Sequence, residues 1–152
     1  MPDIEYAFIA DAADARPGQK FAVLGGGISR LGGPALPIRH PHLALVIGLR
    51  VAPSELHADH DLAFVLQRPD GGEMTSAGAR IRADGPGDGG DTILTFSLDL
   101  WNLSFEMTGD HALRILVNGS ERKRLPLIVE RAVGGPPEAP VQPPFPPPTG
   151  QA

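Results

Sequence analysis

Cysteine is absent from the 152 residues of this sequence, so the chain can form no disulfide bond, thiolate metal site or cysteine nucleophile. Aromatic residues are scarce at 5%, with a single Trp and a single Tyr, which leaves few platforms for stacking sugar rings. Long apolar runs are missing too. The longest, Leu43–Leu49, is far shorter than the roughly 20 residues that a membrane-spanning helix needs, so we expect no membrane insertion.

Positive charge is in deficit, with 13 Lys plus Arg against 18 Asp plus Glu and a formal net charge of -5. This sign repels phosphate, so we expect no nucleic-acid partner. The one basic cluster, Arg122–Arg124, is typical of a solvated corner beside a turn. Residues Met1–Glu5 carry acidic side chains where a signal peptide would be basic, and we therefore expect a cytoplasmic protein.

Glycine and proline, by contrast, are abundant, at 19 and 17 residues, and their frequency excludes long helices almost everywhere. The composition changes at Gly134. Residues 134–152 are rich in proline and offer little apolar surface, so they predict an extended, polyproline-like tail. Residues 1–133 predict one folded domain.

Within this domain the apolar residues recur with period two, as in strands that are buried on one face. The alternating segments are, in chain order, residues 4–10, 21–24, 43–51, 62–66, 74–82, 94–100, 113–117 and 125–129. The connections are too short for crossover helices, so the pattern predicts an all-β, antiparallel sandwich of about eight strands.

Turn chemistry supports this interpretation. Pro69–Gly72 and Asn118–Gly119 predict hairpin turns, and Ser54–Asp59 predicts one helical turn. Near Trp101 the apolar parity changes, from the even-numbered set that ends at Leu100 to an odd-numbered set. A bulge or a change of sheet would explain this change.

Several short motifs resemble a family of small bacterial proteins that is described only as a domain of unknown function. The residues that carry the resemblance are Ala7–Ala12, Leu24–Gly27, Glu55–His60 and Pro69–Gly71, with an apolar strand between the second and third. The similarity spans roughly Ile4–Val129. It implies an immunoglobulin-like β-sandwich and no known activity.

The stretch from Leu103 to His111 also resembles the corner before the penultimate strand of immunoglobulin-like domains. A Tyr usually follows a Gly there, and His111 takes that position after Gly109. The resemblance implies that the imidazole donates a hydrogen bond to a nearby backbone carbonyl, which is a structural role.

Histidine pairs supply the strongest chemical motif. His57 and His60 are three residues apart on the expected helical turn, and Asp61 follows them, so the three could hold zinc. His40 and His42 form a second pair at the far end of a strand. The alternative interpretation is a solvated polar loop, because structural zinc takes four ligands and catalytic zinc three.

A glycine-rich run suggests an anion site, in which Gly26 and Gly27 offer backbone amides and Arg30 a positive charge. The context of a phosphate-binding loop is missing, since no Gly-Lys-Ser/Thr follows and Pro34 obstructs a helix. A tight turn or edge bulge with positive φ is the alternative.

The tail resembles the proline-rich ligands that lie in aromatic grooves. Its candidate partner-binding residues are Pro143, Pro144, Phe145, Pro146 and Pro147. The alternative is a flexible spacer.

Together these features predict a non-enzymatic protein-interaction or accessory module of a larger bacterial assembly, which uses sheet edges and the Pro-rich strap. We expect a protein partner or a homo-oligomer and no cofactor. No serine lies in a Gly-x-Ser-x-Gly elbow, so catalysis has no support from a motif. The alternative is a zinc-binding domain or metal-dependent enzyme centred on His57 and His60, and a carbohydrate-binding domain is a weaker third.

Overall fold

The computed structural model describes residues 1–85 and 87–132. This part of the chain consists of nine strands and one 3-10 turn. In chain order they are β1 (Asp3–Asp14), β2 (Ala22–Gly26), β3 (Arg30–Gly33), β4 (Ile38–Val51), the 3-10 turn η1 (Pro53–Glu55), β5 (Asp59–Gln67), β6 (Glu73–Arg82), β7 (Thr92–Phe105), β8 (Gly109–Val117) and β9 (Ser120–Arg131).

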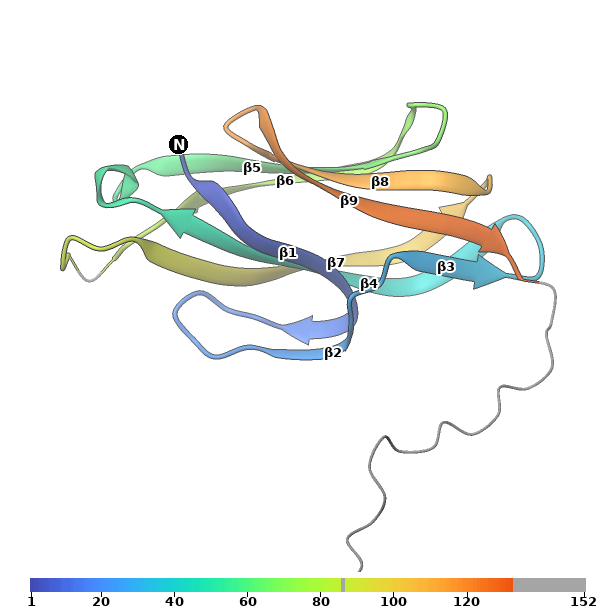
Figure 1. The fold of residues 1–152 in the computed structure, drawn as a ribbon, viewed down its shortest axis with the longest axis horizontal. Helices are drawn as coiled ribbons and strands as arrows, with labels where there is room; N and C mark the ends of the chain where they lie inside the picture. Colours follow the sequence, from blue (N-terminus) through green and yellow to red (C-terminus); the bar gives the residue numbers. More distant parts are fainter. Residues whose placement is uncertain (86, 133–152) are drawn as a thin grey trace, which may run out of the picture.

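The strands form two packed sheets, in the orders β2-β1-β4-β7 and β3-β9-β8-β5-β6 (Figure 1). The strands β1, β4 and β7 take the places of A, B and E of an immunoglobulin domain, and β5, β8 and β9 take those of C, F and G. β6 then corresponds to C′. The chain is therefore an all-β, immunoglobulin-like sandwich, as the sequence predicted. No described strand takes the place that strand D occupies beside E in a constant-type domain.

The core lies between the sheets and is built by alternation along the strands. On β4 the odd-numbered residues point inward, and on β5 and β8 every second residue does. The inward residues of these three strands, all at most 2% exposed, are Leu43, Leu45, Ile47, Leu49, Val51, Leu62, Phe64, Leu66, Leu113, Ile115 and Val117. They form one continuous apolar cluster with Leu127 and Val129 of β9.

A hairpin adds a third layer outside the first sheet. β1 pairs with β4 as far as Ala10 and with β2 from Ala10 onward, so its second half leaves the sheet and folds back beneath it (Figure 1). Tyr6 stacks on Phe21 of this hairpin, with ring centroids 6.3 Å apart. The outward-facing Ala44 and Val46 of β4 are completely buried, and the hairpin is the part of the chain that lies on their side of the sheet.

The nine strands agree with the predicted number of about eight. The fold corrects two details of the sequence prediction. Residues 30–33, which the sequence placed in a glycine-rich turn, form β3, and β3 pairs in parallel with β9, so the sandwich is not wholly antiparallel. The helical turn is shorter than Ser54–Asp59 and ends at Glu55. The change of parity near Trp101 is confirmed. However, β4 and β7 keep one register throughout, so the change is no bulge but a twist at Asn102, whose φ is 53°.

Candidate functional site

The most distinctive surface of the molecule is the free edge of β7. Among the described residues, this 14-residue strand pairs with β4 alone, so its other side presents unpaired backbone donors and acceptors. Asp99 is its only charged residue, and it contains no proline. A long, sparsely charged edge is the kind of strand to which another strand adds.

The other sheet edges in the described chain are protected. β6 carries Glu73, Arg80 and Arg82 within ten residues, and charged side chains discourage strand addition. β2 and β3 are short, with five and four residues, and both contain glycines. Of the edge strands in the described chain, β7 is therefore the one best suited to pair with an added strand.

The sandwich is also open beside β7. The inward residues of this strand lie opposite core residues of β4, yet their side chains are only half-buried. They are Leu94, Phe96, Leu98 and Leu100. Across the opening, Ala77 and Ala79 of β6 point inward beside Phe64 and Leu62, yet both are exposed. The two edge strands thus leave an apolar strip of the interior uncovered.

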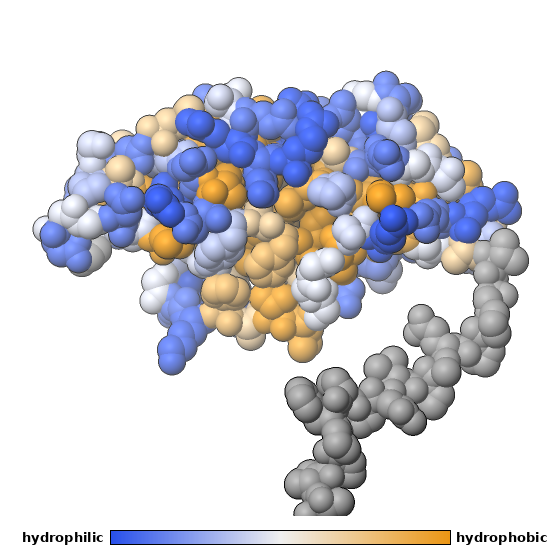
Figure 2. All heavy atoms as spheres, viewed as in Figure 1, coloured by the Kyte–Doolittle hydropathy of each residue, from blue (hydrophilic) through white to orange (hydrophobic). Residues whose placement is uncertain are grey.

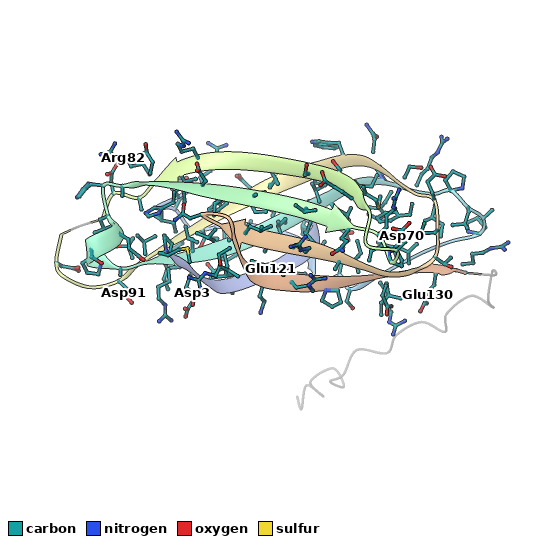
Figure 3. The ribbon with its side chains drawn as sticks, turned by 90° about the horizontal axis from the view of Figure 1, so that it is seen from above. Asp3, Asp70, Arg82, Asp91, Glu121 and Glu130 are labelled. Atoms are coloured by element: carbon teal, nitrogen blue, oxygen red, sulfur yellow. The ribbon has the colours of Figure 1, made fainter. Side chains whose placement is uncertain are left out.

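At one end of this strip lies a hollow of about 480 Å³. Ile81 of β6 faces Leu94 and Phe96 of β7 across it. Its remaining lining comes from Arg82, Asp84 and the hairpin tip at Pro17 and Gly18. Figure 3 shows Arg82 and Asp91 at the same end of the sandwich, where β6 ends and β7 is about to begin.

The outer side of β7 carries an ordered polar cluster. The Nδ1 of His42 lies 2.8 Å from the Asp11 carbonyl oxygen, and its Nε2 lies 2.7 Å from Asp99 Oδ1. Trp101, 65% exposed, lies over the imidazole. Because Asp11 is the point where β1 leaves for the hairpin, this cluster joins the base of the hairpin to β4 and β7.

The residues predicted to hold zinc point in three directions. His57 is exposed and pairs with Asp84 at 3.0 Å, and Asp61 pairs with Arg80 on the outside of β6. His60 points inward, because neighbouring residues of a strand face opposite sides. Within residues 1–85 and 87–132, no three His, Cys, Asp or Glu side chains are placed to share a metal ion.

His60 instead has a structural role. It is 6% exposed, and its Nε2–H donates to the Glu55 carbonyl at 2.9 Å. Its Nδ1 accepts from the Asn118 side chain at 3.3 Å, so both ring nitrogens are engaged by protein. Asn118 has φ of 49° and Gly119 of 81°, which confirms the predicted hairpin turn between β8 and β9.

Of the predicted anion-binding residues, the two glycines lie at a turn and Arg30 lies in an ion pair. Gly25 and Gly27 have positive φ, so the run makes the tight turn that the sequence allowed, and the Ile28 amide donates to the Ile9 carbonyl at 2.9 Å. Gly26 ends β2, and a Cβ there would press on Val23. Arg30 forms an ion pair with Glu130 of β9. The tail residues Pro143–Pro147 lie outside the described residues.

The expectation for His111 is met by the geometry. It is 2% exposed near the start of β8, its Nδ1–H donates to the Gly109 carbonyl at 3.2 Å, and its ring meets Phe105 edge-on. The Nε2 atom is buried without a hydrogen-bond partner among the described residues.

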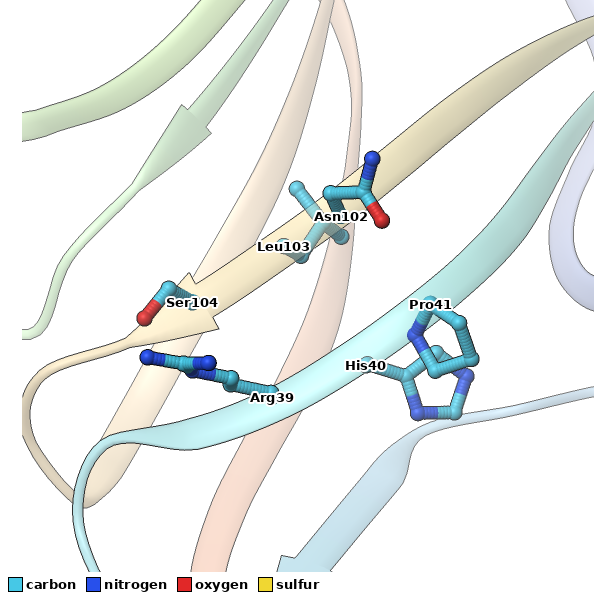
Figure 4. Close-up of a pocket in the computed structure, with 6 residues that line it drawn as sticks. All are labelled: Arg39, His40, Pro41, Asn102, Leu103 and Ser104. Carbon is cyan, nitrogen blue, oxygen red and sulfur yellow. The ribbon is translucent and has the colours of Figure 1, made fainter.

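A second hollow, of about 460 Å³, lies where Pro41 faces Asn102 (Figure 4). Its polar groups do not converge. The guanidinium of Arg39 points toward Ser104, whereas the imidazole of His40 lies beside Pro41 (Figure 4). We see no pairing of nucleophile and base there.

The hairpin exposes apolar side chains of its own. Figure 2 shows hydrophobic residues gathered where the hairpin lies below the sandwich. Leu24 and Phe21 are 72% and 40% exposed. This surface and the β7 edge both lay outside the site residues that sequence reasoning singled out, although the nearly uncharged run 92–105 is a signal that could have marked the edge.

Comparison with families of known sequence finds one match. A family model described as a family of unknown function, DUF6941, matches residues 5–130. A search of curated proteins finds no match. The described part of the chain includes no helix that is long and apolar enough to cross a bilayer.

Two solved structures are similar to the chain. One is the alkylpurine DNA glycosylase AlkC of Pseudomonas fluorescens bound to DNA containing an abasic site analog, at 13% identity and a TM-score of 0.42. The match covers 85% of this chain and 30% of the glycosylase chain. The other is an immunoglobulin-like protein of Pseudomonas aeruginosa, at 10% identity and a TM-score of 0.29, with 82% and 96% covered.

Proposed function

This chain belongs to the DUF6941 family of unknown function, and we propose that it is a non-enzymatic protein-interaction module of a larger assembly that binds its partner along the edge of β7. One observation carries the proposal: among the described residues, β7 is a 14-residue strand with one charged residue and one unpaired side, and it bears a half-buried apolar row. Backbone groups of the edge supply affinity for any extended segment, and the row supplies apolar contact area.

The chemistry of the remaining surface favours binding over catalysis. The exposed His57 is paired with a carboxylate, and the two buried histidines hold backbone carbonyls, so each of these imidazoles has a structural partner. Polar groups in the second hollow diverge. A protein partner or a second copy of the chain is therefore the interaction that this geometry supports best.

Site-specific cross-linking in the host organism tests the proposal. A photoreactive residue at Ser97 on β7 should capture one defined protein, or a second copy, whose mass is then read by mass spectrometry. The same residue at Ser76 on β6 is the matched control, because it lies on the charged edge of the other sheet. Equal capture from both positions would contradict the proposal.

Two lysine variants test whether the captured contact uses the edge. Leu98→Lys places a charge on the half-buried row, and Ile93→Lys places one at an exposed position of the same strand, where the fold is unaffected. Both should reduce cross-linking at least tenfold. Ser76→Lys, on the outer face of β6, should leave cross-linking from Ser97 unchanged.

A further inference from the structure

Resting on the proposed function, we infer that the partner presents an extended segment with apolar side chains at every second position. This segment lies beside β7, in the place of strand D, and its apolar side chains close the open side of the sandwich. The partner segment is thus a β-strand that is apolar on one face and polar on the other.

The alternation of apolar and polar residues in the partner segment follows from the alternation along β7. Side chains of a strand alternate between faces, and strands that pair directly place matching residues on the same face. On β7 the inward residues at 94, 96, 98 and 100 are all large and apolar, while the outward ones at 95, 97 and 99 are Thr, Ser and Asp. A strand that continues this sheet must repeat the same alternation to bury the row.

The hollow beside Ile81 offers a pocket for one large side chain of the partner segment. Its volume of about 480 Å³ exceeds that of a single large side chain, and Ile81, Leu94 and Phe96 supply apolar walls. At protein interfaces a few side chains that fill such pockets, often Trp or Tyr, account for most of the binding free energy. We therefore place the bulkiest apolar residue of the partner segment opposite the first half of β7.

The C-terminal tail of this chain does not fit the site. Eight of the nineteen residues from Gly134 to Ala152 are proline. Proline has no N–H to donate to a neighbouring strand, so a segment this rich in proline forms few of the backbone hydrogen bonds that strand addition needs. The tail therefore lacks the chemistry of the occupant, and we assign the site to a segment of another protein.

A pair of peptides with one composition tests the inference on the full-length chain. One peptide alternates Val with Thr over seven positions between terminal lysines, and the other has the same residues with the valines in one block. Binding is followed by the fluorescence of Trp101, the only Trp, and by amide hydrogen exchange of β7. We expect the alternating peptide to bind at least tenfold more tightly and to slow exchange along β7.

Two further measurements make the result specific. N-methylation of alternate peptide amides should abolish binding if the backbone pairs with β7, because it removes the donors of the ladder. Ile81→Ser should weaken binding of the alternating peptide at least tenfold, whereas Ile128→Ser, half-buried on the outer face of the opposite sheet, should not.

The inference is overturned if the two peptides bind equally, if protection falls on another strand, or if the free protein already forms a dimer through β7. The last result would identify a second copy as the occupant. Cross-linking from Ser97 tests the proposed function separately. If a partner is captured there but the alternating peptide binds no better than the block peptide, the interaction module stands and only the inferred partner sequence is wrong.

Discussion

The indole of Trp101 lies over the imidazole of His42, with the two ring centroids 4.1 Å apart. The two ring nitrogens of His42 lie within hydrogen-bond distance of the Asp11 carbonyl and the Asp99 carboxylate. Through these contacts, two neighbouring strands and the base of the hairpin share one side chain.

Replacing His42 with Phe should therefore loosen the hairpin. The variant keeps a ring beneath Trp101 but loses both hydrogen bonds, which together stabilise the fold by about 1–3 kcal/mol. We expect faster amide exchange across β2 with unchanged exchange in β8. Asp99→Asn, which removes the charge and keeps an acceptor, is the matched control and should have a smaller effect.

Gly48→Ala should destabilise the sandwich. A Cβ at Gly48 would lie closer than 3.0 Å to the ring of Tyr6, which crosses β4 to reach the Thr95 hydroxyl. We expect a loss of about 1–3 kcal/mol from the overpacked site. Denaturant unfolding measures it, and Tyr6→Ala combined with Gly48→Ala should recover the part of the loss that the clash causes. A double variant that loses the sum of the two single effects would show that the ring is not the obstacle.

Two substitutions of His111 should differ in their effect on the free energy of unfolding. Its Nε2 is buried and has no hydrogen-bond partner among residues 1–85 and 87–132, and such an unsatisfied group costs about 1–3 kcal/mol, comparable to what the long bond to Gly109 contributes. His111→Phe should consequently leave stability within about 1 kcal/mol of the parent. His111→Ala should cost about 3 kcal/mol, because it opens a cavity against Phe105. Equal losses in chemical denaturation would refute this account.

His57 and His60 separate the metal interpretation from the structural one. If His60 only holds Glu55 and Asn118, His60→Ala should cost about 2 kcal/mol with or without zinc, since two buried bonds are lost. His57→Ala should change the free energy of unfolding by less than about 0.5 kcal/mol, because the side chain is exposed. Thermal unfolding with added zinc or chelator distinguishes the two interpretations. A zinc-dependent rise in the unfolding temperature that both variants abolish would support the metal site.

Glu121 gives the protein an acid-sensitive hydrogen bond. The Arg124 guanidinium, followed by that of Arg114, lowers the pKa of this carboxyl below its ordinary value of 4.5. A lowered pKa in the folded state contributes stability that is fully present above the unfolded pKa and is lost as the pH falls through the folded one. The parent should therefore unfold at a higher temperature than Glu121→Gln at pH 7, and this advantage should vanish as the pH falls below about 4. A constant difference across that range would contradict it.

The candidate site shows where reasoning from sequence stops. Alternation along a strand is a local property, so the inward faces of β4, β5 and β8 could be read from residues such as Leu45, Phe64 and Ile115. The same alternation explains why the predicted metal ligands do not lie together. His60 and Asp61 are neighbours in a strand, and alternation sends them to opposite faces.

By itself, then, the sequence determined the all-β class, the hairpin turn at Asn118 and the parity of most strands, because each depends on residues close in the chain. The tertiary structure alone decided that β3 lies parallel to β9, that the hairpin folds beneath the first sheet, and that β7 is an edge. Which strand has no second neighbour depends on contacts between segments far apart in sequence. Those contacts form only when the whole core is buried.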